Sequence, residues 1–123
     1  MRKQYYFRAS SRGLLAWDVD RLVRLTRDFS VRAVPLSEIR EIDGPIFGEE
    51  EPPTWRSFVS HAQLMEEAEL VYPIILSADG AVMDGMHRVA KALRDCRSSI
   101  DAVQFTEDPS PDYVGCRPDE LPY

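Results

Sequence analysis

Hydrophobic and polar residues follow two different periods along this chain, and each change of period predicts a strand or a helix. Residues 5–7 predict a short strand near the N-terminus. Residues 16–29 carry apolar side chains at helical spacing, and Asp18 is well placed to cap a helix that begins there. An extended segment follows over 31–36, where Pro35 indicates a sheet edge or a strand end.

The middle of the chain predicts an exposed loop and a second helix. The stretch GPIFGEEEPPTW, which begins at residue 44, is rich in Gly, Pro and Glu and is typical of a loop. Thr54 is a good N-cap for a helix that runs to about Leu70. Trp55 and Phe58 lie at the spacing of its apolar face, so we expect both in the core.

The stretch from residue 72 to residue 105 predicts a strand, a turn, a short strand, a helix and a last strand. These elements are expected at 72–76, 77–80, 81–83, 86–95 and 98–105. The tail 106–123 holds four prolines and should be irregular. This order predicts one compact α+β (α/β) domain over 1–123, with a small mixed sheet flanked by helices and a core at about 31–105.

Composition and charge narrow the class of protein. The chain has 123 residues, of which 44% are hydrophobic and 10% aromatic, as in globular proteins. No apolar run approaches the roughly 20 residues that span a bilayer, and we see no secretory signal, so we expect no membrane partner and a cytoplasmic location. Cys96 and Cys116 form no CxxC motif, so free thiols are expected and no metal site is predicted. A net charge of −6 disfavours nucleic acid as a partner.

The string Asp84-Gly85-Met86-His87-Arg88 stands where a strand gives way to a helix. Gly85 permits a sharp turn or a close approach of another group. The first N–H groups of the helix point outward with the positive end of its dipole, which favours an anion. His87 and Arg88, in the first turn, can add charge-assisted hydrogen bonds. A phosphate group is therefore the expected ligand.

Asp84 leaves two further interpretations open. As the N-cap, its carboxylate would accept the same N–H bonds and exclude an anion. Turned outward, it could hold a divalent cation that accompanies a nucleotide. The plainest alternative is a capped helix whose His87 and Arg88 are simply surface residues.

The stretch YPIILSADGAVMDGMHRVAKAL, followed by IDAVQF, resembles the ParB/sulfiredoxin-like superfamily. The resemblance covers roughly residues 34–105 and includes an upstream PLxxI element. The loop is closest to the kinase-like and sulfiredoxin-like versions of the family. Met86 stands where sulfiredoxins carry their cysteine, so sulfinic-acid reduction is not expected. The tail 106–123 offers no ParB DNA-binding domain.

This resemblance implies that Asp84, Gly85, Met86, His87 and Arg88 contact the phosphates of ATP, ADP or CTP with magnesium. In the small-molecule kinases of this fold, an acidic residue just after the PLxxI strand removes the proton from the substrate hydroxyl. The segment PLSEIREID offers Glu38, Glu41 and Asp43 for that role, and we favour Glu41, whose plain alternative is a surface carboxylate. His61 is expected to be a partly buried structural residue.

Three hypotheses follow. The first is a nucleotide-binding domain that acts as a phosphotransferase on a small-molecule substrate. The second is a non-catalytic nucleotide-sensing or protein-interaction module, and the third is a ParB-like nuclease or DNA-associated protein. The first two differ in whether a carboxylate faces the loop across a cavity large enough for a substrate. The choice of nucleotide, the substrate, the oligomeric state and the role of Arg56 stay open at this stage.

Overall fold

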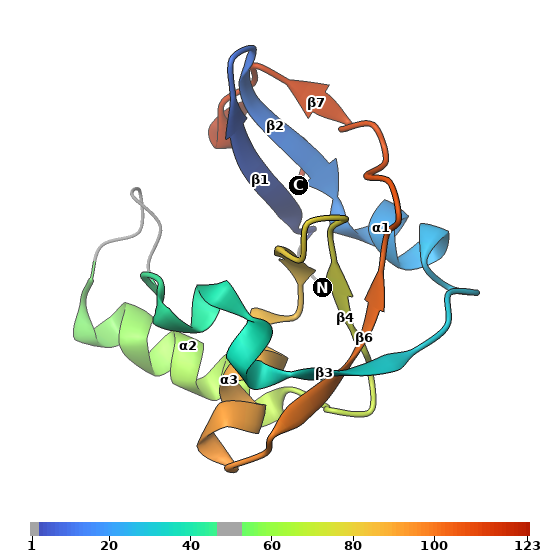
Figure 1. Cartoon of the computed structure of the whole chain (residues 1–123). Coiled ribbons are helices and arrows are strands. Elements are labelled where there is room, and N and C mark those ends of the chain that lie inside the picture. The colour runs from blue at the N-terminus through green and yellow to red at the C-terminus, as the bar shows by residue number, and fades with distance from the viewer. Residues whose placement is uncertain (1–2, 47–52) are drawn as a thin grey trace.

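The computed structural model describes residues 3–46 and 53–123, and within them two small sheets lie against three α-helices (Figure 1). The smaller sheet has the strand order β1–β2–β7 and is antiparallel. It is made of β1 (Tyr5–Ser10), β2 (Gly13–Asp18) and β7 (Tyr113–Val114). The N-terminal hairpin therefore takes its third strand from the C-terminal tail.

The larger sheet has the strand order β3–β6–β4–β5. Its strands are β3 (Arg32–Pro35), β6 (Ser99–Gln104), β4 (Ile74–Leu76) and β5 (Val82–Asp84). β4 and β6 are parallel, whereas the other two pairs are antiparallel, so the sheet is mixed. The predicted mixed α+β fold is confirmed.

Two of the three described α-helices begin at residues that the sequence marks as caps. Asp18 accepts a hydrogen bond from the Asp20 amide at the start of α1 (Val19–Leu25). The Thr54 hydroxyl oxygen accepts from the Ser57 amide at 3.1 Å at the start of α2 (Trp55–Glu67). The remaining helical elements are α3 (Met86–Arg94) and the 3-10 turns η1 (Leu36–Glu38), η2 (Arg40–Asp43) and η3 (Pro118–Glu120).

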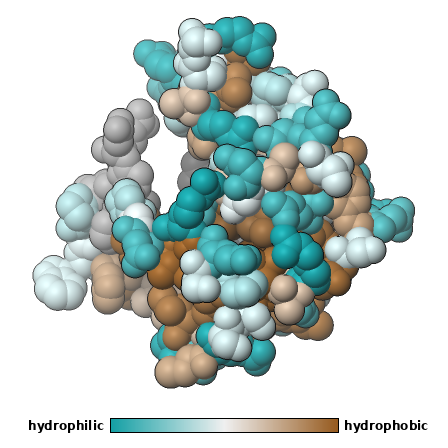
Figure 2. Space-filling view, viewed as in Figure 1, coloured by the Kyte–Doolittle hydropathy of each residue, from teal (hydrophilic) through white to brown (hydrophobic). Residues whose placement is uncertain are grey.

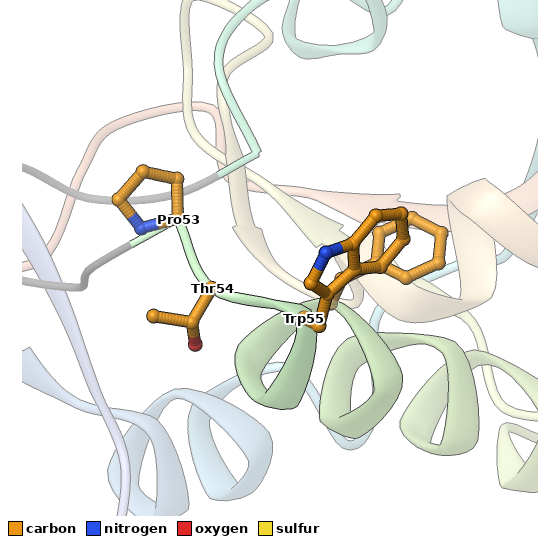
Figure 3. Close-up of a pocket in the computed structure, with 4 residues that line it drawn as sticks. Pro53, Thr54 and Trp55 are labelled. Atoms are coloured by element: carbon orange, nitrogen blue, oxygen red, sulfur yellow. The ribbon is translucent and has the colours of Figure 1, made fainter.

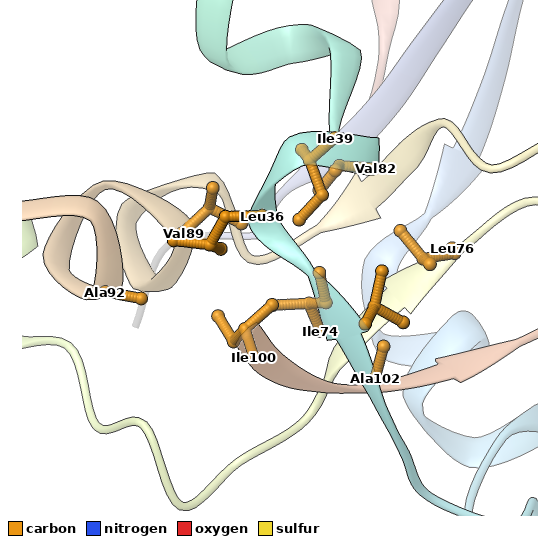
Figure 4. Close-up of a cluster of buried hydrophobic side chains, with 10 residues drawn as sticks. Leu36, Ile39, Ile74, Leu76, Val82, Val89, Ala92, Ile100 and Ala102 are labelled. Atoms are coloured by element: carbon orange, nitrogen blue, oxygen red, sulfur yellow. The ribbon is translucent and has the colours of Figure 1, made fainter. Parts of the chain in front are cut away.

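The larger sheet separates two apolar clusters. Ile74 and Leu76 of β4 point into the cluster between the sheet and α3, whereas Ile75 points into the cluster under the hairpin. All three are at most 3% exposed, as expected for a central strand that is covered on both faces. Figure 4 shows the first cluster, where Val89 and Ala92 of α3 meet the sheet. The sheet thereby fixes the position of α3 and of the loop before it.

Two sequence-based expectations are wrong. Residues 13–18 form β2, a strand that was not predicted, and the helix that Asp18 caps ends at Leu25 rather than at residue 29. None of the thirteen residues of α2 is buried; Trp55 is 85% exposed and Phe58 is 51% exposed, so neither belongs to the core.

The C-terminal tail is largely irregular, as predicted, but acidic side chains tie it to the rest of the fold. Asp108 accepts hydrogen bonds from Arg8 of β1 at 3.0 Å and from the Ala78 amide at 2.8 Å. Asp112 accepts from the Asp18 amide at 2.8 Å. The tail therefore joins the hairpin to the larger sheet.

Apolar side chains are also exposed at the surface. Figure 2 shows hydrophobic surface in the lower half of the molecule, the region where Figure 1 places α2 and α3. Val59 and Leu64 of α2 and Leu93 of α3 are each 45–58% exposed. Within the described residues, no helix is both long enough and apolar enough to cross a membrane.

Candidate functional site

Gly85 forms the N-terminus of α3 in a conformation that favours glycine. Its φ is +113° and its ψ is 20°, and within the described part of the chain no side chain caps the helix. A Cβ added here would lie 2.6 Å from Cγ2 of Ile74 and 2.9 Å from Nη2 of Arg88. The backbone is therefore held close against β4, and the amides of the first turn face outward without a side-chain oxygen on them.

Asp84 does not cap α3 but pairs with Arg88 instead. Arg88 Nη2 lies 3.0 Å from Asp84 Oδ2, and the two side chains are 16% and 21% exposed. Arg88 Nη1 also lies 3.4 Å from the Tyr72 carbonyl oxygen. The ion pair orients the guanidinium beside the helix N-terminus, so an incoming anion has to share this guanidinium with Asp84.

A hollow of about 450 Å3 lies in front of the α3 N-terminus, and we call it the acidic hollow. It is lined by residues 84–88, by residues of α1, by the C-terminal end of α2 with the segment that follows it, and by Gln4. Four carboxylates line it, those of Asp20, Glu67, Glu69 and Asp84, against the single guanidinium of Arg88. These five groups carry a formal charge of −3, so a polyphosphate would enter only together with cations.

A second cavity, of about 410 Å3, lies between η2, α2 and α3, and we call it the apolar cavity. Glu41, His61 and His87 are the polar side chains of its described wall. Its other described lining residues are Ile42, Gly44, Pro45, Ile46, Phe58, Ala62, Met65, Met86, Val89, Ala90 and Leu93. Met86 and His87 line both the apolar cavity and the acidic hollow, so the first turn of α3 forms the wall between them.

Glu41 is held in the wall of the apolar cavity by one of its two carboxylate oxygens. Its Oε2 accepts a hydrogen bond from the Val82 amide at 2.7 Å. Its Oε1 is buried and has no hydrogen-bond partner among the described residues. The other acidic candidates, Glu38 and Asp43, are exposed and do not line this cavity.

The structure thus divides the residues that the sequence singles out. Glu41 shares the apolar cavity with Met86 and His87, whereas Asp84, Gly85 and Arg88 face the acidic hollow. Glu41 consequently faces the first turn of α3 across a cavity, but on the side away from the Arg88 side chain.

His61 joins this group through His87. Nδ1 of His61 lies 2.9 Å from Nε2 of His87, and the two rings are stacked with centroids 5.2 Å apart. His61 is partly buried, as the sequence predicted, but its contact with His87 could not be foreseen from spacing because 26 residues separate them. The mainly apolar face of α2 on which it lies was the available signal.

A shallower hollow lies at the start of α2. It is lined by Pro53, Thr54, Trp55 and Phe58. Figure 3 shows the indole of Trp55 projecting outside the first turn of the helix, and the rings of Trp55 and Phe58 meet edge to face at 6.3 Å. This hollow carries no charged group among those four residues.

Comparison of the chain with protein-family models, with curated proteins and with solved structures returned no match. Among the described residues, no group of three or more His, Cys, Asp or Glu side chains is arranged to hold a metal ion. The site must therefore be interpreted from its own geometry.

Proposed function

We propose that the chain is a ParB/sulfiredoxin-like domain that binds a nucleotide (ATP, ADP or CTP with magnesium) and acts as a phosphotransferase on a small-molecule substrate. The observation that carries this proposal is the shared wall between the two cavities. Met86 and His87 line both, so a phosphate at the α3 N-terminus and a substrate in the cavity that contains Glu41 would lie on opposite sides of the first turn of α3, and the transfer requires this turn to move so that the two can meet.

Each residue of the site has a distinct part in this proposal. Gly85 brings the backbone close, the amides of the first turn of α3 face the phosphate, and Arg88 donates charge-assisted hydrogen bonds to it. Asp84 acts as a positioning residue because it orients Arg88. Magnesium that arrives with the nucleotide would offset the formal charge of −3 in the acidic hollow.

The transfer itself would use Glu41 as the general base. Glu41 takes the proton of the substrate hydroxyl, and the hydroxyl oxygen forms a bond to the terminal phosphorus of a nucleoside triphosphate. The bond between that phosphorus and the bridging oxygen breaks, and its electron pair leaves with the nucleoside diphosphate. We propose that this takes place in the cytoplasm, since neither Cys96 nor Cys116 forms a disulfide in the described structure.

Nucleotide binding is tested by thermal shift with ATP, ADP and CTP in the presence of magnesium. We expect at least one of them to raise the melting temperature, because a ligand that binds only the folded state stabilises it. Arg88→Met should abolish the rise. Arg40→Met is the matched control, because Arg40 is exposed, pairs with Asp79 and does not line the acidic hollow.

Two results would contradict the proposal. The first is a melting temperature that does not change at millimolar nucleotide. The second is an unchanged rise in folded Arg88→Met, which would remove Arg88 from the phosphate site.

A protein-interaction module is the second candidate, and the exposed apolar side of α2 favours it. Trp55 is 85% exposed and lies beside Phe58. Tryptophan is one of the residue types that contribute most to binding at protein interfaces. If the domain only senses or binds, nucleotide will raise the melting temperature without any formation of diphosphate. A coupled assay for diphosphate release with a panel of alcohols distinguishes the two candidates.

A further inference from the structure

The apolar cavity has the size and lining of a small-molecule site. Its volume of about 410 Å3 lies within the roughly 300–1,000 Å3 of typical ligand pockets. Eleven of the fourteen described lining residues carry no ionisable or hydrogen-bonding side chain, so an apolar ligand body would gain from burial there. Three of its lining residues, Ile46, Phe58 and Leu93, are about half exposed in the described structure.

Glu41, in the wall of the apolar cavity, has a carboxylate oxygen that can still accept a hydrogen bond. One of its oxygens is used by the Val82 amide, and the other is buried without a partner in the described structure. A buried carboxylate oxygen that lacks a donor destabilises the folded state. The last torsion of a glutamate side chain is soft, so a small rotation can turn an oxygen towards a ligand in the cavity.

The hydrogen-bond donors and acceptors in the cavity wall indicate which polar group a ligand should carry. A ligand carboxylate is disfavoured, because no Lys or Arg stands among the described lining residues and Glu41 would repel it. A ligand ammonium has three donors, and the wall offers few acceptors because His61 and His87 bond to each other. A single hydroxyl, with one donor for Glu41, leaves the fewest groups unsatisfied.

We infer that the apolar cavity binds a small neutral alcohol with an apolar body, whose hydroxyl donates to Glu41. Only one part of this inference rests on the proposed function, namely that the bound alcohol then accepts the phosphoryl group. The binding itself requires no nucleotide, so the two can fail separately. Free amino acids such as serine, which carry both an ammonium and a carboxylate, are excluded by the same count.

The test uses the whole chain without nucleotide and benzyl alcohol as the probe, with affinity measured by NMR titration. Four comparison compounds each differ from the probe in a stated way. Toluene lacks the hydroxyl, benzoate replaces it with a carboxylate, benzylamine replaces it with an ammonium, and L-serine lacks the apolar body. We expect benzyl alcohol to bind at least about fivefold more tightly than each of them, as one hydrogen bond to a carboxylate would give. In Glu41→Gln the preference for benzyl alcohol over toluene should fall to within about twofold.

Substitutions that fill the cavity locate the binding. Ala62→Phe on α2 and Ala90→Leu on α3 should each abolish binding, since both alanines line the cavity. Ser60→Phe is the matched control: Ser60 is exposed on the same helix and does not line the cavity, so its affinity for benzyl alcohol should stay unchanged. Circular dichroism confirms that each variant is folded, and a variant that is not folded is replaced by the other.

The inference is overturned if the folded wild-type chain fails to bind benzyl alcohol, whether or not it binds nucleotide. It is also overturned if toluene, benzoate or benzylamine binds as tightly, or if Glu41→Gln keeps the full preference. Loss of nucleotide binding with retained binding of benzyl alcohol would contradict the proposed function alone.

Discussion

The imidazole rings of His61 and His87 stack against each other, with Nδ1 of the first 2.9 Å from Nε2 of the second. One ring must donate and the other must accept, so the bond needs at least one neutral histidine. This pair joins α2 to α3, and it matters because α2 has no buried residue of its own. Polar contacts such as this one therefore help to hold α2, and with it one wall of the apolar cavity, in place.

The histidine pair should therefore show measurable coupling. We expect His61→Phe and His87→Phe each to lower the free energy of unfolding by about 1 kcal/mol, because each leaves the other ring without this hydrogen bond. The double variant should be less destabilised than the sum of the two, with a coupling energy of about 0.5–1 kcal/mol. Urea denaturation of the four proteins measures this cycle, and strict additivity would show that the contact contributes nothing.

Lys91 provides the second polar contact between the same helices. Its Nζ donates to the carbonyl oxygens of Glu66 at 3.0 Å and Ala68 at 2.7 Å, and thereby satisfies the C-terminal end of α2. We expect Lys91→Met to lower the free energy of unfolding by about 1–2 kcal/mol. Arg94→Met is the control, since Arg94 is exposed and its ion pairs are screened by solvent, so its replacement should cost less stability than that of Lys91. Equal losses in the two variants would refute the capping role of Lys91.

Local signals in the sequence predict much of the fold. Thr54 marks the start of α2, Pro35 marks the end of an edge strand, and the helix expected at 86–95 is observed at Met86–Arg94. The second strand of the hairpin was missed because its apolar residues run directly into those of α1. The polar turn between residues 10 and 13, which joins β1 to β2, was the signal that could have revealed a hairpin.

The candidate site is less predictable because its geometry depends on how distant elements pack. The (i, i+4) spacing of Asp84 and Arg88 is a local signal that predicts their ion pair. By contrast, only the packing of α2 on α3 brings His61 to His87. Helical spacing likewise placed Trp55 on an apolar face, but it could not show that Trp55, in the first turn of α2, is left 85% exposed in the described structure.

The turn between β4 and β5 should make stability depend on pH through Asp79. The Ser77 hydroxyl, and after it the Ala81 amide, donate to this carboxylate and hold the pKa of Asp79 below its usual value of about 3.9. A carboxylate with a lowered folded-state pKa stabilises the fold above its unfolded-state pKa and loses this effect as the pH falls through the folded-state value. The difference in melting temperature between wild type and Asp79→Asn should therefore be largest above about pH 5 and shrink below about pH 4. A difference that is constant over this range would contradict the assignment.

Gly85 and Gly80 both adopt positive φ, at +113° and +91°, but their surroundings differ. A Cβ at Gly80 would meet nothing within 4 Å, whereas one at Gly85 would meet Ile74 at 2.6 Å and Arg88 at 2.9 Å. Gly80→Ala should therefore cost only backbone strain, of about 1 kcal/mol, and Gly85→Ala should cost several kcal/mol because β4 and α3 must also move apart. Urea denaturation measures both losses.

The same pair of glycines separates stability from binding. Gly80→Ala should keep the rise in melting temperature with nucleotide, because Gly80 does not line the acidic hollow. Gly85→Ala should lose the rise in melting temperature with nucleotide, even at a temperature where the variant is folded. The reason is that the added methyl group would push the Arg88 guanidinium away from the first turn of α3. If Gly85→Ala is folded and keeps the full rise, the phosphate does not lie at the N-terminus of α3, and the close approach at Gly85 serves packing alone.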